Sequence, residues 1–202
     1  MDFEALYQTL YRNKYYVFSF EDMLSFYPRE KKDSLKKTIY RWKESGKVYA
    51  LKKGLYELTY PKDLNIPDLY IAARLYGPSY VSLETALSNY SIIPEVSMAV
   101  TSVTTKPTRR FKNKHGLFIY HTIKPPAFSG YYIQRYSDFD FLMAEPEKAL
   151  IDFLYFKLRG DKEFDIKEAR FDKNALSRLN RKKLNLYAKI YNISLKEFYA
   201  YL

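Results

Sequence analysis

Lysine and arginine are concentrated in one short part of this 202-residue chain. Residues 31–53 contain nine Lys or Arg and two acids, so this segment carries +7 of the chain's net charge of +11. Lysine ammonium groups bind phosphate oxygens, and an arginine guanidinium also forms bidentate hydrogen bonds with guanine. A clustered charge creates a local positive potential that attracts a polyanion, whereas a charge that serves solubility is spread over the surface. Residue type and spacing therefore indicate contact with nucleic acid.

The periodicity of the same segment predicts the elements that position these cations. Leu35, Ile39 and Trp42 recur at i, i+4 and i+7, which predicts the buried face of a helix over residues 30–45. Gly46 ends this helix, and the β-rich tetrapeptides VYAL and LYEL then flank a Lys-Lys-Gly turn. A basic helix followed by a two-stranded wing is typical of DNA-recognition modules. We expect DNA contacts, with Arg41 reading bases and the lysines holding phosphates, from Ser34, Lys36, Lys37, Tyr40, Arg41, Lys52 and Lys53.

The remaining pattern of the first 60 residues completes a small domain. Apolar spacing predicts a first helix over residues 2–12, and Ser19 opens a capping-box pattern for a second helix that Pro28 ends. We therefore predict a winged helix-turn-helix domain over residues 1–60. Residues 60–68 contain two prolines and no periodicity, which predicts a linker before a second domain over residues 68–202.

The second domain is predicted to combine strands and helices. Alternating β-branched and aromatic residues predict strands over residues 96–105, 117–123, 131–136 and 139–143. Helices are expected over residues 69–75, over 82–90 with Ser82 as the N-cap, over 146–158 as a buried helix, and in the basic segment after residue 166. The predicted fold class is thus α+β: an N-terminal winged helix-turn-helix, then a mixed α/β domain with a small antiparallel or mixed sheet and C-terminal helices.

A second basic patch lies in this domain, in a predicted loop or strand edge. It consists of five cations within nine residues: Lys106, Arg109, Arg110, Lys112 and Lys114. Two interpretations stay open. The patch either extends the DNA footprint or contacts an RNA, or it is an exposed loop without a partner.

Enzymatic chemistry finds little support in the sequence. The chain has no cysteine, and its two histidines, His115 and His121, lack metal-binding spacing, so we expect no metal site and no cofactor. Asp138 and Asp140 could share a Mg²⁺ in a nuclease, but Lys148 does not complete the usual E-x-K element, and turn solvation explains both aspartates. We expect no catalytic site. The N-terminus resembles neither a signal peptide nor a membrane span, so we expect a cytoplasmic protein with no membrane partner.

Three segments of the second domain carry a family resemblance. They read GPSYVSLETALSNYSIIPE (77–95), VTSVTTKPTRRF (100–111) and AEPEKALIDFLYF (144–156). In order and spacing, residues 5–160 resemble the AbiEi family of antitoxins from bacterial type IV toxin-antitoxin systems, which act in abortive infection against phage.

The resemblance implies a particular function. A family member is expected to repress its own operon by binding inverted repeats in double-stranded promoter DNA with its winged helix. Its second domain is expected to counteract a nucleotidyltransferase-like toxin without forming a stable complex with it. Two alternatives remain: a plain winged-helix transcription factor with a ligand-sensing second domain, and a metal-dependent nuclease that docks on DNA.

Overall fold

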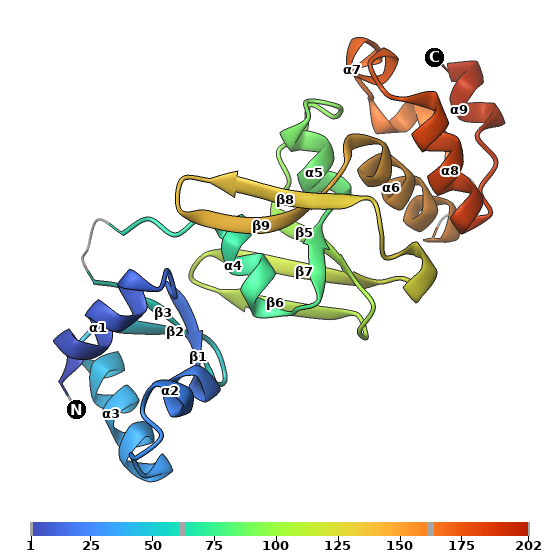
Figure 1. Ribbon diagram of the computed structural model, residues 1–202. Coiled ribbons are helices and arrows are strands. Elements are labelled where there is room, and N and C mark those ends of the chain that lie inside the picture. Colours follow the sequence, from blue (N-terminus) through green and yellow to red (C-terminus); the bar gives the residue numbers. More distant parts are fainter. Residues whose placement is uncertain (1, 61–63, 161–163, 202) are drawn as a thin grey trace. The chain divides into compact units, whose positions relative to one another are not determined.

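The computed structural model describes residues 2–60, 64–160 and 164–201. Within them the protein is of the predicted α+β class, with helices around one three-stranded and one six-stranded sheet (Figure 1). The chain divides into two compact units. We call Met1–Leu75 with Tyr136–Phe139 the N-terminal unit, and Tyr76–Arg135 with Asp140–Leu202 the C-terminal unit.

The N-terminal unit combines four helices with a small antiparallel sheet, whose strand order is β1-β3-β2. Its elements are α1 (Phe3–Arg12), β1 (Val17–Ser19), α2 (Phe20–Phe26), α3 (Lys32–Glu44), β2 (Val48–Lys52), β3 (Leu55–Leu58) and α4 (Asp68–Leu75). The helices predicted around residues 2–12 and 30–45 are confirmed, and the two β-rich tetrapeptides form β2 and β3. Strand β1 was not predicted, because three residues are too few to show a period.

Local sequence explains how these elements begin and pack. The capping box predicted at Ser19 is present: the Ser19 hydroxyl accepts a hydrogen bond from the Asp22 N–H, and the Asp22 carboxylate accepts one from the Ser19 N–H. In α3, the predicted apolar stripe is buried together with Thr38. Trp42 packs edge-on against Phe3 of α1, with ring centroids 5.3 Å apart. This packing turns the opposite, basic face of α3 outward.

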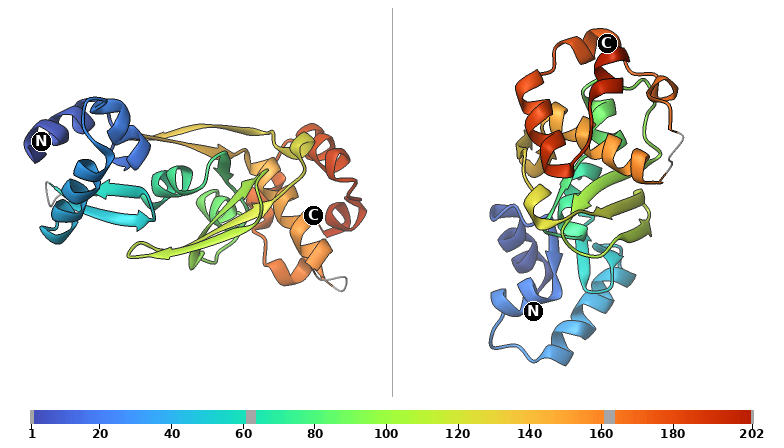
Figure 2. Two further views of the ribbon diagram at one scale, coloured as in Figure 1. Left: turned by 90° about the horizontal axis from the view of Figure 1, so that it is seen from below. Right: turned by 90° about the vertical axis from the view of Figure 1, so that its right-hand side faces the viewer.

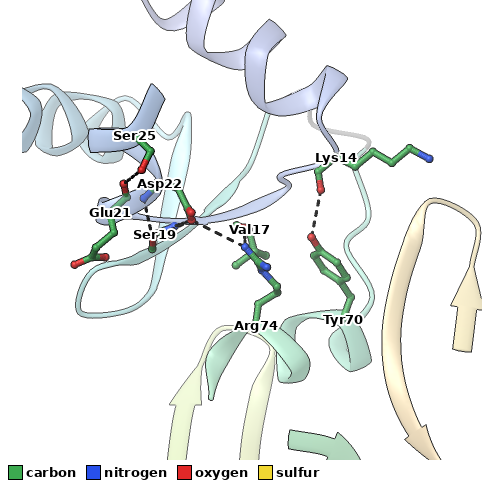
Figure 3. A network of polar contacts seen from close by, with 8 residues as sticks. All are labelled: Lys14, Val17, Ser19, Glu21, Asp22, Ser25, Tyr70 and Arg74. Carbon is green, nitrogen blue, oxygen red and sulfur yellow. Dashed lines mark hydrogen bonds and ion pairs between the residues drawn. The ribbon is translucent and has the colours of Figure 1, made fainter. Parts of the chain in front are cut away.

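Helix α4 belongs to the N-terminal unit, although the sequence prediction placed residues 68–75 in the second domain. Figure 3 shows the reason: the Arg74 guanidinium donates to the carbonyl of Val17, and the Tyr70 hydroxyl donates to the carbonyl of Lys14. The unit therefore extends beyond the predicted end at residue 60. Of the predicted linker, residues 61–63 lie outside the described residues.

The C-terminal unit is built on a mixed sheet with the strand order β6-β7-β5-β4-β9-β8. Strand β4 runs antiparallel to β5 and parallel to β9, and β7 runs parallel to β5 and antiparallel to β6. The strands are β4 (Ser79–Val81), β5 (Ala99–Thr104), β6 (Arg109–Asn113), β7 (Gly116–Thr122), β8 (Tyr131–Tyr136) and β9 (Phe139–Ala144). Four of them match the predicted strands, and the sheet is mixed, which is one of the two arrangements that the sequence predicted.

Helices pack around this sheet, and the last three of them form a C-terminal cluster. They are α5 (Leu83–Asn89), α6 (Pro146–Gly160), α7 (Lys173–Ser177), α8 (Arg181–Tyr191) and α9 (Lys196–Tyr201), with short 3₁₀ turns at Pro125–Ala127 and Ile166–Ala169. Residues 147–154 of α6 are all buried, so the predicted buried helix is confirmed. The C-terminal helices stay gathered around α6 in both views of Figure 2, and their apolar residues share its core.

Candidate nucleic-acid interface

The exposed face of α3 brings together the residues predicted for it. Ser34, Lys36, Lys37, Tyr40 and Arg41 are all exposed, and the same five residues line a shallow depression on the helix surface. Tyr40 is the aromatic residue among these five, and it is 62% exposed. An exposed tyrosine among four polar side chains on a helix face offers both hydrogen bonding and apolar contact to a ligand.

A groove of about 320 Å³ continues this face toward the β2–β3 hairpin. It is lined from α3 by Lys36, Tyr40 and Lys43 among others, and from the hairpin by residues that include Lys53 and Gly54. Gly54 has a φ of +78°, a conformation that glycine adopts without strain, so the tight turn holds Lys53 at the tip. Lys43 is exposed and belongs to this surface, although it was absent from the predicted site. Its place at i+7 from Lys36 could have identified it.

The partners of these cations differ. Arg41 donates from Nη2 to the Thr38 hydroxyl at 3.1 Å, and Lys36 forms an exposed ion pair with Asp33 at 3.3 Å. Lys53 is exposed at the hairpin tip. Lys52 is different: its ammonium is half-buried and donates to the carbonyl of Leu75 at 2.5 Å, at the end of α4. Lys52 therefore makes a hydrogen bond within the N-terminal unit, whereas Lys53 is exposed.

The second basic patch lies on and beside β6, at one edge of the six-stranded sheet. Arg109, Arg110 and Lys112 are exposed there, and because strand side chains alternate, Arg109 lies on the opposite face from the other two. Lys106 donates to the carbonyl of Gly77 and lies over the ring of Tyr76. The patch is thus divided between two faces of a strand, and its members do not form one continuous surface.

A buried polar cluster in the C-terminal unit was missed by the sequence analysis. Lys148 and Asp152 lie one turn apart on α6, are fully buried and form an ion pair. The Lys148 ammonium also donates to the hydroxyls of Tyr80 at 2.8 Å and Tyr191 at 3.0 Å. The carboxylate of Asp152 accepts hydrogen bonds from Tyr80, Tyr191 and Ser82. The i, i+4 spacing of a Lys and an Asp inside an apolar run was the available signal.

Two consequences follow from this cluster. Ser82 does begin α5, but its hydroxyl makes no capping bond, because it donates to Asp152; the predicted side-chain cap is wrong. Burial lowers the pKa of Lys148, while Asp152 opposes that shift by favouring the charged ammonium. Burial, together with the nearby carboxylate of Asp152, raises the pKa of Tyr80 and of Tyr191, so both phenols stay protonated as donors.

The cluster also ties together the three segments that carry the family resemblance. Tyr80 and Ser82 come from the first segment, and Lys148 and Asp152 from the third. From the second, the Thr101 hydroxyl donates to the carbonyl of Ser82 at 2.8 Å. The segments therefore meet in one core, where fully satisfied polar groups specify a single arrangement.

The two aspartates considered for nuclease chemistry each form an ion pair with a different basic residue. Asp140 accepts two hydrogen bonds from the Arg135 guanidinium, at 2.8 and 2.9 Å, and Asp138 pairs with Lys14 at 2.8 Å. Burial lowers the pKa of His121, which packs against Phe156. Nowhere in the described parts of the chain do three His, Asp or Glu side chains gather as a metal would require.

Comparison of the chain with protein-family models gives no match, and comparison with curated protein sequences gives none either. In the described residues, every helix is too short or too polar to cross a membrane.

Proposed function

We propose that this protein is a DNA-binding antitoxin that represses its own operon. In this proposal the N-terminal unit is a winged helix-turn-helix, in which α3 enters the major groove and the β2–β3 hairpin is the wing beside the phosphates. Its ligand is double-stranded promoter DNA with inverted repeats, so we place the protein in the cytoplasm. The proposal includes no catalytic reaction, metal or cofactor.

The observation that carries the DNA-binding half is the continuous basic surface from α3 to the hairpin tip. Lys36, Lys37 and Arg41 are exposed on one helix face, and a groove joins that face to exposed Lys53. The element order helix, strand, helix, helix, hairpin supports the same interpretation. An α-helix fits the major groove, and a hairpin that follows this helix in the chain is well placed for contacts with the phosphates beside the groove.

The antitoxin half rests on the resemblance to the AbiEi family. The three resembling segments share the buried core around Lys148 and Asp152, which supports treating them as one functional domain. We propose that this domain counteracts a nucleotidyltransferase-like toxin encoded beside it, without a stable complex, in defence against phage.

Fluorescence anisotropy with the DNA upstream of the gene tests the first half. The full chain should bind this DNA more tightly than a scrambled duplex of equal length. Arg41→Ala should cost about 1–3 kcal/mol on the promoter and little on the scrambled duplex, whereas Lys53→Ala should weaken both alike. Arg12→Ala, an exposed arginine on α1, is the matched control and should bind like the wild type. Equal affinity of the wild type for both duplexes would contradict the proposal.

Co-expression in a bacterial host tests the second half. The neighbouring open reading frame should slow growth when induced alone, and the present chain, expressed from an independent promoter, should restore growth. The Arg41→Ala variant should still restore growth, because repression of the native operon is not needed in that arrangement. A neighbouring gene that is harmless, or toxicity that this chain leaves unchanged, would contradict the antitoxin assignment.

A further inference from the structure

The C-terminal unit contains a pocket that the proposed function does not use. Its volume is about 700 Å³, within the range of about 300–1,000 Å³ typical of small-molecule sites. Three parts of the unit line it: the residues after β5, the end of β7 with the turn that follows, and the last turns of α6. The pocket is therefore built by the sheet and its buried helix, and none of its lining residues belongs to α3.

Aromatic and apolar side chains form one wall. Phe156 is half-buried and packs against His121, with ring centroids 4.9 Å apart. The ring of Tyr155 stacks on that of Tyr191, with ring centroids 4.5 Å apart, and this contact holds the Tyr155 ring in place. Anchored ring faces of this kind bind planar heterocycles by stacking, with little loss of side-chain entropy.

Cations and hydroxyl groups line the rest of the pocket. The Arg159 guanidinium donates from Nη1 to the Tyr155 hydroxyl at 3.1 Å, which orients it, and Lys124 is exposed at the rim. The pocket also presents three threonines, of which Thr108 and Thr122 are hydrogen-bonded to each other at 3.0 Å. Among the described residues that line it, none is acidic. This charge balance favours an anion and disfavours an amine.

We propose that this pocket binds a free nucleotide. Its base would stack on the aromatic wall, its phosphates would meet Arg159 and Lys124, and its sugar hydroxyls would face the threonines. One ligand class combines a flat ring, hydroxyls and anionic oxygens, and the pocket supplies a partner for each. This inference does not depend on DNA binding by α3.

Calorimetric titration of the full chain with ATP, GTP, CTP and UTP tests the proposal, with adenosine and tripolyphosphate as partial ligands. At least one nucleotide should bind with one-to-one stoichiometry, and both partial ligands should bind at least tenfold more weakly. Arg159→Ala should raise the Kd of that nucleotide about tenfold or more, because it removes a charged hydrogen-bond donor. Phe156→Leu keeps apolar volume but removes the ring, and should raise it about fivefold or more.

Arg178→Ala is the matched control, an exposed arginine of the same unit that does not line the pocket, and its Kd should equal that of the wild type. Photolabelling with 8-azido-ATP locates the ligand independently: the label should fall on the tryptic peptide of residues 149–157, which contains Tyr155 and Phe156. Failure of all four nucleotides to bind would overturn the proposal. Tripolyphosphate binding as tightly as the nucleotide, or a label confined to α3, would overturn it as well, since either would indicate unspecific attraction to cations.

Discussion

Replacing Asp152 with asparagine is expected to destabilise the C-terminal unit severely. Asparagine keeps the shape of the side chain and one acceptor oxygen, but it removes the charge that balances Lys148. Neither Lys148 nor Asp152 has any exposed side-chain surface, so water cannot compensate the loss. The hydroxyls of Tyr80, Tyr191 and Ser82 would also lose a charged acceptor.

The expected cost follows from complete burial. Breaking a buried ion pair by removing one partner costs about 3–5 kcal/mol, because it leaves an uncompensated charge. A domain is typically stable by about 5–15 kcal/mol, so Asp152→Asn should remove a large part of the unfolding free energy. The exposed pair of Lys36 and Asp33 is the matched comparison: its side chains are 64% and 87% exposed, and Asp33→Asn should cost less than about 0.5 kcal/mol.

Urea denaturation followed by two probes measures this difference. Trp42 of α3 is the only tryptophan in the sequence, so its fluorescence reports on the N-terminal unit, while far-ultraviolet circular dichroism reports on both units. In Asp152→Asn, part of the dichroism transition should move to lower urea, and the Trp42 transition should stay in place. A loss below about 1 kcal/mol would refute the reasoning, because the cluster would then tolerate an unpaired lysine.

Three further predictions concern charge and the unit boundary. Four exposed lysines of the proposed interface are expected to hold phosphates: Lys36, Lys37, Lys43 and Lys53. They predict a slope of about −3.6 for the logarithm of the affinity constant against the logarithm of the salt concentration, or about a 150-fold loss of affinity between about 50 and 200 mM salt, and Lys53→Ala should reduce the slope by about 0.9 in a salt titration. A fragment of residues 1–75 should unfold at a higher urea concentration than a fragment of residues 1–60, with a free energy of unfolding about 1–3 kcal/mol larger. The reason is that only the longer fragment keeps the hydrogen bonds from Arg74 to β1 and from Tyr70 to the turn before β1. Equal urea midpoints would contradict the assignment of α4 to the N-terminal unit. Burial raises the pKa of Glu145, but hydrogen bonds from Lys183 and Tyr187 outweigh burial and hold that pKa below its usual value. The stability that this carboxylate contributes is therefore present above about pH 4.5 and is lost as the pH falls through the lowered pKa. Glu145→Gln should accordingly flatten the acid side of a plot of unfolding free energy against pH.

Local signals explain what the sequence predicted correctly. The stripe of Leu35, Ile39 and Trp42 predicted α3, because a helix period within thirteen residues is visible without knowing the fold. The same reasoning placed the polar residues of α3 on the exposed face. Strands β5, β7, β8 and β9 were predicted for a similar reason, since β-branched and aromatic residues are concentrated in them.

Long-range contacts explain what the sequence did not reveal. Strand β1 exists because it pairs with β3, almost forty residues away in register. Lys52 looked like a free cation at a hairpin tip until α4 supplied a carbonyl for it. Lys148 and Asp152 were treated as ordinary members of a helix, because nothing local indicates that Tyr80 and Tyr191 close over them.

The absence of cysteine from the sequence allows the central claim, DNA contact through α3, to be tested directly. Tyr40→Cys places a unique thiol on the exposed face of α3, and Leu186→Cys places one on α8, at a side chain of similar exposure, 58% against 62%. Each variant is mixed with promoter duplexes that carry a disulfide-activated tether on a base in the major groove. We expect Tyr40→Cys to form a crosslink at one or two tether positions in the inverted repeat and Leu186→Cys to form none. Crosslinking through Leu186→Cys with none through Tyr40→Cys would contradict DNA contact through α3.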